Sequence, residues 1–143
     1  MRKRTQAREI ALQALYQHDL QRKIDGGVKG TVDDYEAFIR DAADDPEVRS
    51  YARVLLDGAI ASMDALDERI AAAAVNWKLS RIAPVDRSIL RLALFEILES
   101  RDVPPKVAIN EAIDLAKKFS TEQSGAFVNG ILDKIYSELE AGE

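Results

Sequence analysis

Residues 102–134 constrain the fold of this chain most, because they predict two helices joined by a short polar hinge. Pro104 and Pro105 cannot stand inside a helix, so they end what precedes them and can open the helix that follows. Apolar residues then recur at helical spacing as far as Phe119, and a second apolar stripe begins at Phe127. The stretch therefore predicts a helical hairpin rather than a strand pair.

The polar hinge, residues 120–125, carries two candidate helix-start signals. Ser120 followed by Gln123 has the spacing of a capping box, in which two side chains each satisfy a backbone N–H at the start of a helix. Ser124 is the second candidate, because a serine at the N-cap accepts a hydrogen bond from the first turn. Either serine is expected to begin the second helix.

Apolar residues at helical spacing predict three further helices in the first half of the chain. These helices cover residues 5–22, 32–43 and 46 to about 70. A break in the third helix near Gly58 or Ser62 remains open at this point. No stretch alternates long enough between apolar and polar residues to predict a strand.

Two short clusters mark helix ends, and one helix stands out by its composition. The Asp-Gly-Gly cluster at 25–27 is expected to end the first helix, and Asp-Asp-Pro at 44–46 to start the third, in which Tyr51 belongs to the apolar pattern. Residues 84–98 leave almost no polar face, which is typical of a buried central helix. We expect an all-α fold of roughly seven helices around one core.

Composition narrows the classes of function. The 143 residues suffice for one domain spanning 1–143. The absence of cysteine excludes disulfides and thiolate chemistry and suits a reducing compartment. No apolar run is long enough to span a bilayer and no signal peptide is visible, so a cytoplasmic protein is expected. The net charge of -5 argues against a protein that coats nucleic acid over its whole surface.

The first eight residues nevertheless concentrate positive charge. Arg2, Lys3, Arg4 and Arg8 precede the first acid, Glu9. Basic side chains at a helix N-terminus oppose the helix dipole, so stability alone does not explain this basic start. It predicts either a local nucleic-acid contact or a frayed, solvated tail.

An enzyme is not supported by the residues present. The only histidine, His18, lies inside the first expected helix, where a lone histidine is more often a packed or surface residue than a catalyst. The acid pairs at 33–34 and 44–45 lie at helix starts, where capping explains them. None of the common metal, phosphate, dinucleotide or nucleophile motifs occurs. We predict no catalytic residue, no metal site and no cofactor.

Single-stranded RNA binding requires only positive charge for the backbone and planar groups for the bases. Lys117, Lys118, Phe119 and Phe127 flank the hinge. If the first helix packs beside the hinge, these residues form one surface with the basic start. At helical spacing the two phenylalanines could also belong to the core, and both interpretations stay open.

Three segments resemble the NusB family of bacterial transcription antitermination factors. They are RTQAREIALQALY near the start, APVDRSILRLALFEIL in the centre, and, as the most specific, VPPKVAINEAIDLAKKF followed by FVNGILDK. The resemblance runs nearly end to end, although residues 21–45 are not diagnostic. It implies an all-helical fold of two packed helical bundles without catalysis.

The resemblance also implies partners. NusB proteins bind boxA, a short single-stranded element in the leader of ribosomal RNA operons, together with NusE, a small-subunit ribosomal protein. The pair joins NusA and NusG on RNA polymerase and promotes reading through terminators. Some members pair with themselves, and a homodimer that covers the RNA-binding residues would be a stored, inactive form.

Carried over by position, the resemblance assigns residues to two surfaces. Tyr16 and Asp86 match the side that faces NusE, and Asp86 is expected to be an exposed acid in the first turn of its helix. Thr5 and Gln6 replace arginines of some relatives, which suggests RNA binding that depends on NusE. Gln123 replaces a common acid. The expected RNA-binding residues are Arg4, Arg8, Lys117, Phe119, Ser124 and Phe127, with Arg2 and Lys3 from the basic start.

Two alternatives to an antitermination factor stay open. RNA cytosine methyltransferases carry a NusB-like RNA-binding module ahead of a catalytic domain for which 143 residues leave no room. A protein-binding scaffold, whose basic start is only a tail, is the second alternative. Loss of RNA affinity on neutralising Arg4 and Arg8 would favour RNA binding over the scaffold.

Overall fold

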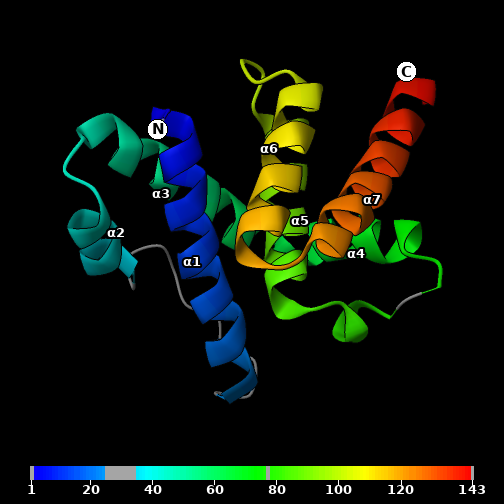
Figure 1. The fold of residues 1–143 in the computed structure, drawn as a ribbon, viewed down its shortest axis with the longest axis horizontal. Coiled ribbons are helices and arrows are strands. Elements are labelled where there is room, and N and C mark those ends of the chain that lie inside the picture. Colours follow the sequence, from blue (N-terminus) through cyan, green and yellow to red (C-terminus); the bar gives the residue numbers. More distant parts are fainter. Residues whose placement is uncertain (1, 25–34, 77, 143) are drawn as a thin grey trace. The chain divides into compact units, whose positions relative to one another are not determined.

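A computed structural model describes residues 2–24, 35–76 and 78–142, and within these ranges it contains seven α-helices, one short 3-10 helix and no strand (Figure 1). The chain divides into two compact units, residues 1–61 and 62–143. The predicted all-α class and the two helical bundles implied by the resemblance are confirmed. The hydrophobic pattern alone predicts one core, because it does not reveal which helices pack together.

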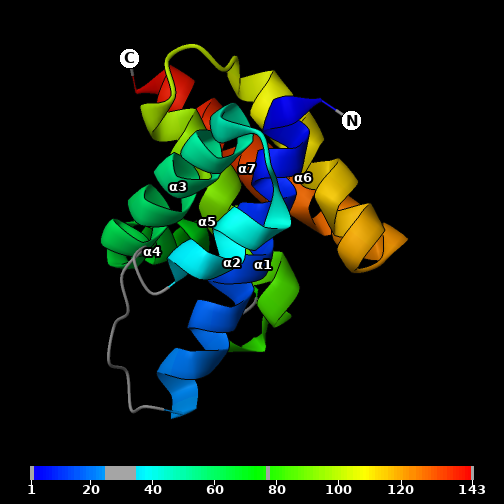
Figure 2. The same ribbon diagram turned by 90° about the vertical axis from the view of Figure 1, so that its left-hand side faces the viewer.

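The first unit consists of α1 (Lys3–Ile24), α2 (Glu36–Ala42) and α3 (Pro46–Ala61). The long helices α1 and α3 pack against each other, and α2 contacts both, as Figure 2 shows. The α1 helix extends further at both ends than predicted. The predicted start of α2 at 32–34 and the Asp-Gly-Gly cluster at 25–27 lie outside the described residues.

The start of α3 follows the prediction. The Oδ1 atom of Asp45 accepts a hydrogen bond from the backbone N–H of Glu47 at 2.9 Å. These two residues stand on either side of Pro46 in the sequence. An aspartate at this place satisfies a donor that the helix itself leaves unpaired. The helix ends at Ala61, and a new helix starts at Met63, so the break that the sequence left open lies at Ser62.

The second unit contains α4 (Met63–Ala73), the 3-10 turn η2 (Leu79–Arg81), α5 (Pro84–Glu99), α6 (Pro105–Phe119) and α7 (Glu122–Ala141). Helix α5 contacts α4, α6 and α7. Its side chains Ile89, Leu90 and Leu94 are fully buried, which confirms the predicted central helix. No helix among the described residues is long and apolar enough to cross a membrane.

The cap of α7 is neither of the two predicted serines. Thr121 is the N-cap, and its Oγ1 atom accepts the backbone N–H of Ser124 at 3.0 Å. Ser120 instead ends α6, and Ser124 lies inside the first turn of α7. Both serine predictions are wrong for the same reason. Thr121 has the extended backbone of an N-cap, and it lies three residues before Ser124, whose N–H it accepts.

Candidate nucleic-acid interface

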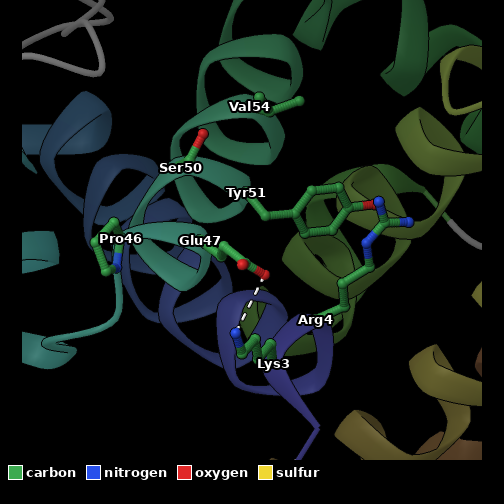
Figure 3. A pocket seen from close by; sticks show the side chains of 7 residues that line it. All are labelled: Lys3, Arg4, Pro46, Glu47, Ser50, Tyr51 and Val54. Carbon is green, nitrogen blue, oxygen red and sulfur yellow. Dashed lines mark ion pairs between the residues drawn. The ribbon is translucent and has the colours of Figure 1, made fainter.

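A groove lies in the first unit between the first turn of α1 and the first turns of α3 (Figure 3). It has a volume of ≈ 410 Å³. Both helices begin here, and Pro46 sets the start of the second one. The residues that line this α1–α3 groove are Lys3, Arg4, Pro46, Glu47, Ser50, Tyr51 and Val54.

Lys3 is held between two carboxylates of the α3 start. Its Nζ atom lies 3.2 Å from Asp45 Oδ2 and 3.2 Å from Glu47 Oε2, and the second ion pair is drawn in Figure 3. The hydrogen bond to Asp45, and then that to Glu47, raises the pKa of Lys3 above its usual value. The backbone N–H of Glu47 and then Lys3 lower the pKa of Asp45. These groups stand largely in solvent, so the ion pairs hold Lys3 only weakly.

Two arginines of the basic start converge on one aromatic ring. The guanidinium carbon of Arg4 lies 4.5 Å from the centroid of Tyr51, and that of Arg8 lies 5.9 Å from it. Both distances fall within the range of cation–π attraction. Arg4 is exposed at the groove, whereas Arg8 is only 4% exposed. The ring of Tyr51 therefore lies near one exposed and one buried arginine.

The second unit has its own pocket where the starts of α5 and α7 meet. Arg87 donates to the carbonyl oxygens of Leu79 and Ile82 at 3.2 and 3.3 Å, and it thereby fixes the turn that carries the exposed Arg81. The pocket has a volume of ≈ 300 Å³. Its lining residues are Arg81, Ile82, Ala83, Asp86, Thr121, Gln123, Ser124 and Phe127.

Asp86 is buried in this junction, not exposed as predicted. The side chain is 6% exposed, and its Oδ2 atom accepts a hydrogen bond from the hydroxyl of Ser124 at 2.9 Å. Its Oδ1 atom has no hydrogen-bond partner among the described residues. The prediction of an exposed acid is wrong because the first turn of α7 packs over the first turn of α5, which the spacing of a single helix does not reveal.

The hinge residues combine charge with half-buried aromatic rings. Phe127 and Phe119 are each partly exposed, and Lys118 Nζ lies 5.4 Å from the ring centroid of Phe119. Lys117 is exposed, and its stem crosses α7 at Gly125, where a Cβ atom would come within 3.1 Å of the Lys117 Cγ atom. The absence of a side chain at Gly125 thus lets Lys117 lie across the helix start.

The structure gathers the predicted RNA-binding residues into two groups, one in each unit. Lys3, Arg4 and Arg8 surround the α1–α3 groove, and Lys117, Phe119, Ser124 and Phe127 surround the hinge. Arg2 is exposed just before α1, and Tyr16 is half-buried further along it.

Sequence reasoning missed two residues at these sites. Tyr51 reads as one more apolar residue of α3, although its ring lines the groove. Arg81 carries no sequence signal beyond its charge. His18, in contrast, is buried and lies 3.2 Å from the Tyr35 hydroxyl through its Nδ1 atom, which agrees with a packed histidine.

These features define a class: all-α proteins made of two compact helical units, in which a basic first helix and a polar helix–helix hinge carry the candidate binding residues. Comparison with known proteins identifies the class. The family model described as the NusB family matches residues 5–137. Transcription antitermination protein NusB of Anaeromyxobacter dehalogenans is 49% identical over 138 residues, which cover 96% of this chain and 92% of that protein.

Solved structures agree with the sequence comparison. NusB of T. maritima matches with a TM-score of 0.80 at 36% identity, over 94% of this chain and 91% of that one. A crystal structure of antitermination factors NusB and NusE in complex with double-stranded RNA matches with a TM-score of 0.83 at 27% identity, over 96% of this chain and 98% of that one. The chain belongs to the NusB family, and the resemblance found in the sequence is confirmed.

Proposed function

We propose that this chain is a transcription antitermination factor that binds boxA RNA of ribosomal RNA leaders together with NusE and promotes read-through by RNA polymerase. The 49% identity to a protein named for transcription antitermination carries this proposal. A related structure holds NusB with NusE and RNA, which supports both partners. The wider assembly would add NusA and NusG on the polymerase, and such a factor would work in the bacterial cytoplasm.

The proposed RNA contacts come from both units. In the first, Arg2, Lys3 and Arg4 present positive charge to phosphates, since all three are exposed. Arg8 is buried, so its part is to hold Tyr51 and add positive potential near the ring. In the second unit, Lys117 supplies charge at the hinge. Phe119, Phe127 and the Ser124 hydroxyl complete this second group of RNA contacts.

The proposed NusE side uses Tyr16 and Asp86 in different ways. Tyr16 is half-exposed on α1 and can touch a partner directly. Asp86 is buried against Ser124, so it would act by fixing the junction of α5 and α7 rather than by contact. A homodimer formed through the partner-binding residues would compete with NusE and would hold the protein inactive.

A titration tests the proposal directly. The full chain, with and without NusE, is titrated against a boxA-like RNA and a scrambled RNA of equal length at several salt concentrations. Preference for boxA, strengthened by NusE, supports the function. The log of affinity should fall with the log of salt by about 0.7 per neutralised phosphate on a single strand.

Two other outcomes contradict parts of the proposal. Equal affinity for both RNAs would reduce the basic start to a nonspecific electrostatic patch. Tight boxA binding by the isolated chain would contradict the expected dependence on NusE, which rests on Thr5 and Gln6 standing where some relatives have arginines.

A further inference from the structure

We propose that the α1–α3 groove holds one unstacked nucleotide of the bound single-stranded RNA. The base would lie against Tyr51 and Val54, and the phosphate would meet Lys3 and Arg4. This site is a step beyond the proposed function and rests on it. The basic start by itself indicates only general positive charge. The proposal adds a specific pocket and makes α3 part of the RNA-binding surface.

The first support is the face of α3 that the groove uses. Glu47, Ser50, Tyr51 and Val54 follow the spacing i, i+3, i+4 and i+7, so they share one side of the helix. The core uses a different stripe of α3, Val48, Ala52, Leu55, Leu56 and Ala59, all of which are buried. Val54 is 50% exposed, so the groove keeps an apolar surface in solvent beside an aromatic ring.

The second support is the match between the groove and the two parts of a nucleotide. A base is planar and stacks on aromatic rings or on arginine planes, whereas its phosphate is an anion. Figure 3 shows Tyr51 reaching from α3 toward Arg4, whose guanidinium carbon lies 4.5 Å from the ring centroid. Lys3 adds a second cation at the same end. The volume of ≈ 410 Å³ lies within the usual range for small-molecule pockets.

The third support is the exposed acid that lines the groove. Glu47 lines it and pairs with Lys3 at 3.2 Å, and Asp45 pairs with the same lysine. These carboxylates oppose a bare anion, so phosphate alone gains little from the two cations. A nucleotide gains stacking on Tyr51 in addition, and its phosphate can replace the weak, solvated ion pairs of Lys3. The groove therefore favours a nucleotide over free phosphate.

An abasic scan tests the proposal on the full chain in the presence of NusE. Each nucleotide of the boxA-like RNA is replaced in turn by an abasic one, and the affinity of each RNA is measured. One base stacked on an aromatic ring should contribute roughly tenfold in affinity. We expect Tyr51→Leu to bind the intact RNA roughly tenfold more weakly than the wild type does. We also expect one abasic position that weakens binding to the wild type to cause no further loss of affinity in Tyr51→Leu. Tyr51→Phe should behave as the wild type.

A second pair of variants keeps the test independent of the packing of Tyr51. Val54→Glu adds a negative charge to the groove at an exposed position and should weaken RNA binding roughly tenfold. Val75→Glu makes the same change at a valine that is 75% exposed in the turn after α4, outside the groove, and should bind as the wild type. Circular dichroism and thermal unfolding confirm that each variant is folded.

The outcomes separate this inference from the proposed function. The groove proposal is overturned if the wild type prefers boxA while Val54→Glu binds as tightly as Val75→Glu and no abasic loss depends on Tyr51. If the wild type shows no preference for boxA with NusE present, the proposed function itself fails, and the nucleotide site fails with it.

Discussion

The hydroxyl of Ser124 donates a hydrogen bond to Asp86 Oδ2 across 2.9 Å, which joins the first turn of α7 to the first turn of α5. The same hydroxyl lies 2.9 Å from the Ser120 hydroxyl and 3.1 Å from that of Thr121. A buried carboxylate thus organises the three hydroxyl residues of the hinge. The hinge is therefore ordered by a side chain that lies 38 positions away in the sequence.

Ser124→Ala should destabilise the protein by about 1–3 kcal/mol, because it removes the donor from a buried carboxylate. Urea unfolding measures the change. Ser137→Ala is the matched control, since Ser137 is exposed on the same helix. Equal stability of the two variants would show that the bond to Asp86 contributes nothing.

Asp67→Ala should destabilise the protein by about 3–5 kcal/mol, because it leaves a buried arginine without its carboxylate. Arg91 on α5 donates to Asp67 on α4 through its Nε atom at 2.7 Å and through a second nitrogen at 2.9 Å, and its side chain is 4% exposed. Glu36→Gln serves as the comparison, because it breaks the ion pair between Glu36 and Arg53. Both side chains of that pair are more than a third exposed. Chemical unfolding should show a much larger loss for Asp67→Ala, and similar losses would contradict this ranking.

The carboxyl group of Glu36 should titrate below its usual pKa of 4.5, because its hydrogen bonds with Arg53 favour the charged form. Its contribution to stability is then present above pH 4.5 and is lost as the pH falls through the lowered pKa. An NMR titration of the side-chain carboxyl measures the pKa. Arg53→Met should return the pKa towards its usual value, and an unchanged pKa in that variant would show that Arg53 does not lower it.

The double variant Asp45→Asn, Glu47→Gln should bind RNA more tightly, because it frees Lys3 from both carboxylates. Titration against the boxA-like RNA measures the gain, since Lys3 then meets the phosphate without first leaving Asp45 and Glu47. Asparagine is also a good N-cap, so the start of α3 is retained. Glu138→Gln with Glu140→Gln has the same charge change at exposed positions of α7 and serves as the control. If both double variants gain the same affinity, net charge alone explains the gain.

Arg4 and Arg8 should respond differently to neutralisation. Arg4→Gln is expected to weaken RNA binding and to reduce the salt slope by about 0.7, with little change in stability, since Arg4 is exposed. Arg8→Gln should lower stability by about 1–3 kcal/mol, since the side chain is buried beside Tyr51. Salt-dependent titration and chemical unfolding of both variants check this division. An unfolding loss in Arg4→Gln equal to that in Arg8→Gln would contradict it.

Helix positions follow well from the sequence, because they depend on local chemistry. Pro84 and Pro105 open helices where a missing N–H is tolerated, and the apolar composition of α5 predicts its central place. The burial of Asp86 depends instead on α7, which the spacing within α5 does not contain.

The site was predicted less completely, because its contacts also join residues of different helices. Tyr51 fits the apolar spacing of α3, yet its ring lies under Arg4 of another helix. The basic start, in contrast, is visible as a local excess of charge. Side-chain partners across helices therefore separate what the sequence could predict from what required the structure.

The close approach of Lys117 to Gly125 has a consequence for how this protein can change over time. A Cβ atom at position 125 would come within 3.1 Å of Lys117 Cγ and 3.2 Å of its Cε atom, so even alanine would push the lysine stem away. The two positions are therefore expected to covary, with a larger residue at 125 accompanied by a shorter one at 117. A lineage that lost this glycine would have to shift the long cation that now crosses the start of α7, or shorten it.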